Sequence, residues 1–320
     1  MTRTASSGDD HVVTIQRLER PHLDEARRVL AEACPFDRAS EVAREKLFSP
    51  GPAATPPPGA PPPPIVEPEA FGAWQGDALV GVAACAGRWL RVLAVDIMAR
   101  RRGVGSALLA ACEDATRARG DTRISALDQP GNYLAPGLDE RNTETISWLE
   151  RRGWESKVEP RVNVLINVRE NPRVSLERVM AATARASRRG YEIRRARSDE
   201  PELLAAVATE YGGAWPFEIA RALTYDPPGV HVAIKDGAYC AFAAHDGNNR
   251  GLGWFGPTGT WPAHRGNGLG EALLLACLLD VGTERDQCEV AWIGPRPFYE
   301  KVAGIAGERR FVVLGRQLDR

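Results

Sequence analysis

The chain has 320 residues, of which 43% are hydrophobic and 26% charged, with a formal net charge of −1, and these values are ordinary for a soluble globular protein. So small a net charge gives no reason to expect binding to nucleic acid or to an anionic membrane, and no apolar run is long enough to span a bilayer. The polar start MTRTASSGDDHVV lacks an apolar signal core, and the six cysteines form no CxxC pair; we therefore expect a cytoplasmic chain with buried thiols and no metal site.

The first half alternates short apolar strands with amphipathic helices. Strand patterns lie at 12–19, 69–75, 78–87, 89–96, 122–128 and 161–168, and helical patterns lie at 22–33, 39–48, 106–120 and 142–154. The turns QGD and GR join the strands between 69 and 96, which indicates an antiparallel meander. Ten prolines between Pro50 and Pro68 interrupt the pattern, and we interpret 50–68 as an extended surface insertion.

The second half repeats this order. Strand patterns lie at 191–196, 230–237, 238–247, 252–260, 288–294 and 309–318, and helical patterns lie at 199–211, 215–224 and 297–304, with a further helix after residue 268. Each half reads β–αα–βββ–α–β–α–β. The Arg-rich stretch 172–189 is predicted to be a solvated helical connector. The sequence therefore predicts two tandem α/β domains, 1–171 and 190–320.

A glycine-rich loop that leads into an apolar helix occurs once in each half. Arg100, Gly103 and Gly105 recur 165 positions later as Arg265, Gly268 and Gly270. Glycines let the backbone turn sharply and expose its N–H groups, and the following helix adds its unpaired amides and positive dipole end. Such a loop suits a diphosphate, whose oxygens the flanking arginines could pair with. The sequence GK[ST] of a Walker loop and the GxGxxG spacing of a dinucleotide fold are absent from both loops.

The two loops resemble motif A, R-x-x-G-x-G/A, of the GNAT acetyltransferase superfamily. The residues that carry this resemblance are Arg100, Arg101, Arg102, Gly103, Val104 and Gly105 in the first half and Arg265, Gly266, Asn267, Gly268, Leu269 and Gly270 in the second. PFYEKVAG (297–304) is similar to the F-Y-E-K-x-G-F signature of the same family. The resemblance covers nearly the whole chain as two tandem copies. It implies mixed, mostly antiparallel sheets with splayed central strands that bind acetyl-CoA.

The fourth strand of the second half fits this implication. Gly256, Pro257 and Gly259 are poor residues for a regular central strand and favour a bulge, which would open a slot beside it. An ordinary strand end followed by a turn is the alternative. The resemblance implies that the pantetheine arm of coenzyme A lies in such a slot, and we expect Thr258, Gly259, Thr260 and Phe298 to contribute to the cofactor site.

The resemblance also implies a general acid. It places Tyr299 beside the sulfur of coenzyme A, which leaves as a thiolate. The phenol could protonate this thiolate, since a thiol has a pKa of about 8.5. The alternative is that Tyr299 is only a buried core residue. The attacking amine needs a proton acceptor, and Asp246 and His245 rank above Glu289 for this role. Each could equally be a turn or surface residue.

The two halves differ at the position of this acid. Aligning ISWLERRG with PFYEKVAG places Trp148 opposite Phe298 and Leu149 opposite Tyr299. Because leucine cannot donate a proton, we expect catalysis in the second half, whereas the first half either binds coenzyme A without catalysis or serves as a substrate-binding or packing surface.

The acceptor is expected to be a small-molecule amine. Trp215, Trp254 and Trp292 could form an aromatic wall for an amino sugar or aminoglycoside, and core packing is the alternative for each. The rival function is a non-catalytic acyl-CoA-binding sensor or scaffold. The sequence gives no oligomeric state.

Overall fold

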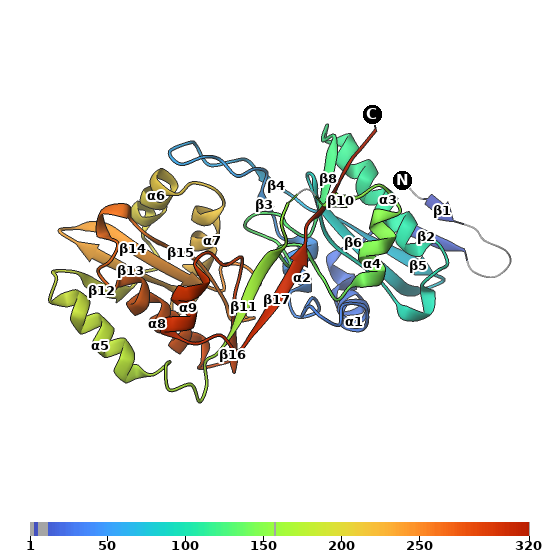
Figure 1. The fold of residues 1–320 in the computed structure, drawn as a ribbon. Coiled ribbons are helices and arrows are strands. Elements are labelled where there is room, and N and C mark those ends of the chain that lie inside the picture. Colours follow the sequence, from blue (N-terminus) through green and yellow to red (C-terminus); the bar gives the residue numbers. More distant parts are fainter. Residues whose placement is uncertain (1–2, 6–11, 157, 320) are drawn as a thin grey trace. The chain divides into compact units, whose positions relative to one another are not determined.

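The computed structural model describes residues 3–5, 12–156 and 158–319, and Figure 1 shows its course. The chain divides into two compact units. Unit 1 contains residues up to Ala53, Pro64–Arg161 and the residues from Arg310 onward, and unit 2 contains Ala54–Pro63 and Val162–Arg309. Both units are mixed α/β structures, which confirms the predicted fold class.

The sheet of unit 1 is built on the predicted meander. Its strands lie in the order β1 (Arg3–Ala5), β2 (Val13–Arg17), β5 (Glu69–Gln75), β6 (Ala78–Ala86), β7 (Trp89–Val95), β8 (Arg123–Ala126), β18 (Leu314–Gln317) and β10 (Glu155–Ser156). β7 and β8 are parallel, and the other neighbours are antiparallel.

Helices cover both faces of this sheet. α3 (Val104–Ala118) and α4 (Thr143–Glu150) bury apolar side chains such as Leu108 and Leu149 in one core with β2, β5 and β7. α1 (Leu23–Ala33) and α2 (Ala43–Phe48) pack against β6 and β7, and their side chains lie outside that core.

Unit 2 repeats the arrangement. Its strands lie in the order β12 (Glu192–Arg195), β13 (Val230–Lys235), β14 (Ala238–His245), β15 (Trp254–Thr260), β16 (Gln287–Val290), β11 (Arg161–Asn167) and β17 (Gly307–Val312). The last two residues of β17, which belong to unit 1, pair there with β9 (Leu138–Asp139).

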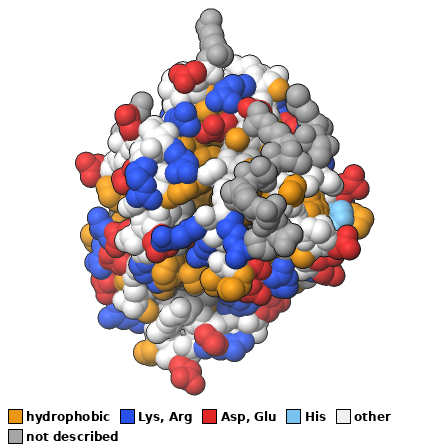
Figure 2. All heavy atoms as spheres, turned by 90° about the vertical axis from the view of Figure 1, so that its right-hand side faces the viewer, with side chains coloured by type: hydrophobic (Ala, Val, Ile, Leu, Met, Phe, Trp, Pro, Cys, Tyr) orange, Lys and Arg blue, Asp and Glu red, His pale blue; other side chains and the backbone are white. Residues whose placement is uncertain are grey.

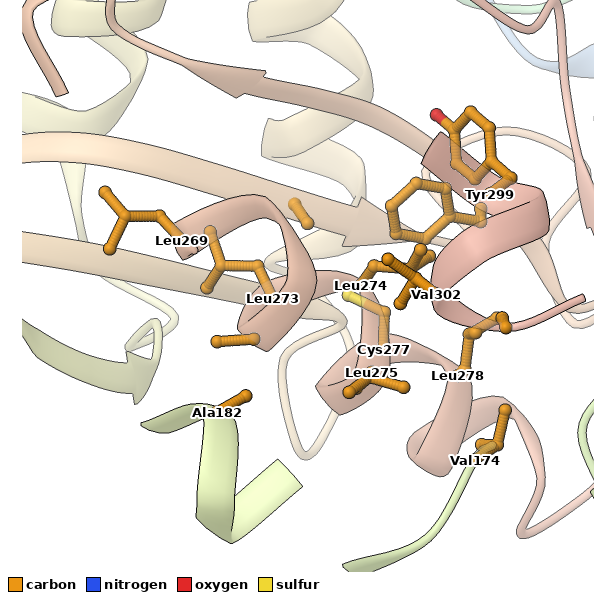
Figure 3. Packing of buried hydrophobic residues seen from close by; sticks show 14 of the residues in the cluster. Val174, Ala182, Leu269, Leu273, Leu274, Leu275, Cys277, Leu278, Tyr299 and Val302 are labelled. Atoms are coloured by element: carbon orange, nitrogen blue, oxygen red, sulfur yellow. The ribbon is translucent and has the colours of Figure 1, made fainter. Parts of the chain in front are cut away.

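Two separate apolar cores cover the two faces of the unit 2 sheet. One is formed with α5 (Leu176–Ser187), α8 (Leu269–Val281) and α9 (Arg296–Val302), and Figure 3 shows its side chains around α8. The other is formed with α6 (Pro201–Glu210) and α7 (Trp215–Ala222).

The last strand of each half differs from the prediction. We expected 161–168 to close the first domain and 309–318 to close the second, but β11 pairs with β16 in unit 2. The stretch 309–318 forms two strands, of which β17 lies beside β11 in the second sheet as expected, whereas β18 pairs with β8 in unit 1. The observed units therefore do not end at 171 or begin at 190, and α5 of the expected connector packs on α8 inside unit 2. Alternating apolar residues such as Val164 and Ile166 specify a buried sheet face, and they do not specify which strand lies alongside.

The Pro-rich insertion is ordered at both ends. β3 (Gly51–Pro52) pairs with β4 (Ile65–Val66), and the stretch between them, Ala54–Pro63, belongs to unit 2. Among the described residues, none of the helices combines the length and apolar character needed to cross a bilayer.

Candidate functional site

The central strands of unit 2 diverge. β15 and β16 are paired in parallel only at Trp254–Glu289 and Phe255–Val290. Beyond that point β15 continues to pair with β14, as at Phe242–Gly259, after an irregularity between Ala243 and His245. The predicted bulge is therefore present, and residues 256–260 have no ladder partner on the β16 side among the described strands. An extended ligand could use the N–H and C=O groups of that edge.

The loop at 265–270 exposes backbone amides at the end of this strand. Gly266 and Gly268 have φ values of 77° and 82°, which only glycine adopts readily, and a Cβ at either position would meet nothing within 4 Å. The first intrahelical bond of α8 runs from the Ala272 N–H to the Gly268 carbonyl at 3.2 Å. The amides of residues 269–271 thus precede the first intrahelical hydrogen bond and lie at the positive end of the helix dipole. This is suitable geometry for an anion.

The first-half loop has the same construction. Gly103 precedes α3 with a φ of 82° and open space where a Cβ would lie. The Arg100 Nε donates to the Val95 carbonyl at 3.1 Å, and the Arg265 Nε donates to the Thr260 carbonyl at 3.2 Å. Each of these two arginines is thus anchored to the last residue of the diverging strand.

The remaining loop residues take different places. Arg101 and Arg102 are exposed, whereas Val104 and Leu269 are buried, so that only the backbone of the latter two could face a ligand. The Asn267 side chain donates to the His264 and Arg265 carbonyls and shapes the loop. On β15, the Thr258 hydroxyl donates to the Phe242 carbonyl at 3.0 Å.

Tyr299 lies at the edge of the core on α9. Its side chain is 5% exposed, and its ring lies 6.3 Å from that of Phe255 and 5.1 Å from that of Phe298. Figure 3 shows its hydroxyl pointing away from the apolar cluster around Leu274 and Val302. Burial, with a smaller contribution from Cys288, raises the pKa of Tyr299 to about 12. The phenol is therefore protonated at neutral pH and able to donate.

The corresponding positions in unit 1 confirm the alignment of the two halves. A Cβ at Gly270 would lie 3.5 Å from the Phe298 ring, and a Cβ at Gly105 would lie 3.7 Å from the Trp148 ring. Leu149 is 2% exposed in the core of unit 1, where unit 2 has Tyr299. α4 in unit 1 and α9 in unit 2 thus occupy equivalent places, but α4 has no phenol at the position of Tyr299.

A buried arginine also distinguishes unit 1. Arg91 corresponds to Gly256 by the same 165-residue offset, and it is fully buried, whereas a Cβ at Gly256 would meet nothing within 4 Å. Its guanidinium donates to the Gln129 side chain and to the Ser49 carbonyl. Nearby in unit 1, the buried Lys46 ammonium lies 2.6 Å from Glu45 and 3.0 Å from Asn132. The sequence inference missed this cluster, although extending the repeat to the strands would have found Arg91.

His245 and Asp246 take part in a buried charge network. The His245 Nδ1 lies 3.0 Å from Asp246, its Nε2 lies 3.4 Å from Asp280 near the end of α8, and Asp280 also binds His231 and Arg195 at 2.7 Å each. Burial alone would lower the pKa of His245, but the hydrogen bonds with Asp246 and Asp280 outweigh it and raise the pKa to about 9. His245 is therefore protonated at neutral pH. Asp246 also accepts from the Gly253 N–H at 2.8 Å.

Glu289 lies where β15 and β16 begin to diverge. The residues on either side of it, Cys288 and Val290, face the α8 core, so Glu289 points to the opposite face of the sheet. It accepts from the Asn163 side chain at 2.6 Å and from Arg309 at 3.1 Å, and the side chains of Glu289 and Arg309 are 11% and 12% exposed. This carboxylate is thus at the vertex of the slot.

The three candidate tryptophans lie in different elements. Trp215 begins α7 and contacts Tyr211 with a ring separation of 5.0 Å. Trp254 is buried at the start of β15, and Trp292 is 42% exposed after β16. Sequence reasoning did not identify Tyr211 or Trp261, whose rings lie 5.3 Å apart. Over the face shown in Figure 2, acidic and basic side chains are interspersed.

Comparison with known proteins adds to these observations. Residues 45–138 match the family model described as the acetyltransferase (GNAT) family. No curated protein matches the sequence significantly.

Several solved structures have a similar fold. The chain is similar to a tandem GNAT protein from the clavulanic acid biosynthesis pathway, with a TM-score of 0.62, 18% identity and coverage of 96% of this chain and 99% of that one. It is similar to a GCN5-related N-acetyltransferase from Sphaerobacter thermophilus, with a TM-score of 0.62, 16% identity and coverage of 98% of each chain. A glucosamine N-acetyltransferase region in a fungal multi-domain GH3 β-N-acetylglucosaminidase gives a TM-score of 0.69 at 14% identity, over 95% of this chain and 38% of that chain.

At these identities the structures establish the fold alone, and this chain spans less than half the length of the fungal protein. Residues 45–138 thus match the GNAT family model, and the chain as a whole has the fold of tandem GNAT proteins.

Proposed function

We propose that the chain is an acyl-CoA-dependent N-acyltransferase that transfers acetyl to the primary amine of a small molecule, with the reaction in unit 2. The observation that carries this proposal is the combination, in that unit, of diverging strands, an open glycine loop and a buried, protonated tyrosine. In unit 1, Leu149 stands in place of the tyrosine, and the buried Arg91 stands in place of Gly256.

The residues of unit 2 fit acetyl-CoA. The amides of 266–270 and the Arg265 guanidinium would hold its diphosphate. The open edge of β15, residues 256–260, would pair with its pantetheine arm as an added strand does. When bound, the thioester supplies an activated acyl group.

Tyr299 and Glu289 divide the proton transfers. As the amine nitrogen bonds to the acyl carbon and the carbon–sulfur bond breaks, the Tyr299 hydroxyl gives its proton to the sulfur. Glu289 takes the proton that the amine nitrogen loses, directly or through a water, because it is the carboxylate at the vertex of the slot. Glu289 is proposed in preference to His245 because His245 is already protonated at neutral pH, and in preference to Asp246 because Glu289 lies where β15 and β16 diverge.

The proposal is tested by thiol release from acetyl-CoA with amino sugars, aminoglycosides, polyamines and amino acids as acceptors. Turnover with at least one class is expected, and absence of turnover with all four would reject the enzymatic proposal. The acceptor class is expected among amines with a ring, since the half-buried Trp215 and the exposed Trp292 could contact one.

Glu289→Gln tests the proton acceptor. We expect kcat to fall by roughly 10²-fold, because an amide cannot take the proton of the amine. His245→Gln is the matched comparison and should leave kcat within about twofold of the unchanged chain. If the His245 variant loses as much kcat as the Glu289 variant, the assignment of Glu289 is wrong.

The rival function, coenzyme A binding without transfer, has support in unit 1, where the loop is kept without the tyrosine. Calorimetry with coenzyme A distinguishes two sites per chain from one. Binding at both units combined with no transfer to any amine would favour a sensor or scaffold.

A further inference from the structure

The stretch Ala54–Pro63, which we call the proline arm, is fixed on unit 2 by backbone hydrogen bonds. The Gly59 N–H donates to the Ala208 carbonyl of α6 at 3.0 Å, and the Gly213 N–H donates to the Pro56 carbonyl at 2.7 Å. Because proline lacks an N–H, a run of prolines cannot form a strand ladder, but its carbonyls remain good acceptors. The proline arm thus docks at the end of α6.

Gly212 allows the arm to approach closely. A Cβ at Gly212 would lie 2.7 Å from the Pro57 carbonyl carbon and from the Pro58 nitrogen, both of which are backbone atoms. Gly213 has a similar positive φ, 65° against 61°, but a Cβ there would meet nothing within 4 Å. The two neighbouring glycines therefore share the same backbone requirement, and only Gly212 has a steric one.

The residue before Gly212 reaches the slot. A Cβ at Gly259, on the open part of β15, would lie 2.7 Å from Cζ of Tyr211 and 2.9 Å from its hydroxyl oxygen. The Tyr211 ring also packs against Trp215 at 5.0 Å and Trp261 at 5.3 Å. Tyr211 thus covers the outer part of β15 from the α6–α7 face, while α8 lies on the other face.

The Tyr211 hydroxyl has an unusual environment. Its oxygen is buried and has no hydrogen-bond partner among the described residues. Burial is the largest cause that raises the pKa of Tyr211 to about 12, with Glu210 adding to it and Arg265 opposing it.

We propose that the proline arm is a positioning element of the coenzyme A site in unit 2: it holds the junction of α6 and α7, and through Tyr211 it fixes Gly259 on the open part of β15. This inference rests on the proposed function. The contacts of the arm described above are with the end of α6 and with Gly212 and Gly213, so it acts on the site through Tyr211. Loosening the arm should therefore weaken coenzyme A binding and raise KM for acetyl-CoA, with little effect on kcat.

The test compares Gly212→Ala with Gly213→Ala in the full chain. The Gly212 variant must displace the arm. We expect its Kd for coenzyme A at the unit 2 site, measured by calorimetry, to rise roughly tenfold, because the site is no longer held in its binding conformation. The Gly213 variant has the same backbone strain without the clash, and its Kd should stay within about twofold. Hydrogen exchange at Gly59, Ala60 and Gly213 reports whether the arm has been released.

Two further variants distinguish the packing of the Tyr211 ring from the contribution of its hydroxyl. Tyr211→Ala should weaken binding as much as Gly212→Ala, whereas Tyr211→Phe, which keeps the ring on Gly259, should recover most of the affinity. Faster exchange in the arm with unchanged coenzyme A binding overturns the proposal, and so does unchanged binding in Tyr211→Ala. If the unchanged chain itself does not bind coenzyme A, the proposed function is rejected, and the role of the arm in this site is rejected with it.

Discussion

Tyr299 combines two properties that an acid for a thiolate needs. It is nearly buried, and that burial raises its pKa to about 12, so the proton is present throughout the neutral range. The hydroxyl nevertheless points out of the apolar cluster (Figure 3). The same burial makes the ring part of the core, so a test of its chemistry must keep the ring.

Tyr299→Phe keeps the ring and removes the proton donor. We expect kcat to fall by roughly 10²-fold, the range typical for loss of a general acid, with KM for acetyl-CoA little changed. Steady-state thiol release measures this. Tyr239→Phe is the control, because the Tyr239 hydroxyl donates to Glu200. Unchanged kcat in Tyr299→Phe across the pH range would remove this residue from the mechanism.

The His245 network predicts a pH dependence of stability. Since the pKa of His245 is raised from 6.5 to about 9 in the folded state, its contribution is fully present below pH 6.5 and is lost as the pH rises toward 9. That contribution is on the order of 2 kcal/mol. Chemical unfolding of the unchanged chain and of His245→Gln at pH 6 and pH 9 measures it. The variant should lose less stability over this interval, and equal losses would show that the network is not responsible.

At the scale of elements, the glycine loops are the features that the sequence revealed most directly. Gly268 and Gly103 both precede a helix with a φ of 82° and with open space where a Cβ would lie. The positive φ favours glycine at both positions, and the lack of a side chain leaves the neighbouring amides accessible. The two loops therefore offer a matched pair of substitutions.

Gly268→Ala and Gly103→Ala should each cost about 1 kcal/mol of stability, because a Cβ is strained at positive φ. Their functional effects should differ. The Gly268 variant should raise KM for acetyl-CoA by roughly tenfold, and the Gly103 variant should leave it within about twofold, since transfer is assigned to unit 2. Equal effects of the two variants on KM would place transfer in both units.

The elements themselves were largely predictable. β5 was expected at 69–75 and lies at Glu69–Gln75, and helices were found at each expected site, because period and punctuation are local properties of the chain. Two other features were not predictable in this way. The partners of β11 and β18 depend on which sheet edge is available. The docking of the proline arm depends on Gly212, which lies 155 and 154 residues after Pro57 and Pro58.

The internal repeat made part of the candidate site predictable from the sequence. The alignment of Trp148 and Leu149 with Phe298 and Tyr299 holds in space, whereas His245 and Asp246 were ranked for the base role on type and position alone. A short polar pair at a strand end does not reveal Asp280, which approaches from a helix that begins 24 residues later. Arg91 lies inside the apolar strand pattern 89–96, which does not reveal the burial of its guanidinium.

At the scale of the whole molecule, the exchange of terminal strands makes each sheet depend on distant sequence. Leu314 is fully buried in the core of unit 1, although it lies near the end of the chain. Val164 is fully buried in the core of unit 2, although it precedes most of that unit in the sequence.

Leu314→Ala and Val164→Ala should therefore destabilise opposite units. The first should lower the protection of amides in β7 and β8 by about 2–5 kcal/mol, and the second should act on β15 and β16 by a smaller amount, since valine loses fewer atoms. Hydrogen exchange followed by peptide mass measurement distinguishes the units. If Leu314→Ala exposed β15 rather than β8, the observed strand assignment would be wrong.

The pairing of β18 with β8 also has a consequence for biosynthesis. Roughly 190 residues separate the two strands, so at about 5–20 residues per second the ribosome needs on the order of 10–40 s to deliver the second after the first. During that interval the N-terminal sheet has an open edge of the kind that recruits other chains. The nascent protein should accordingly depend on chaperones until β18 emerges.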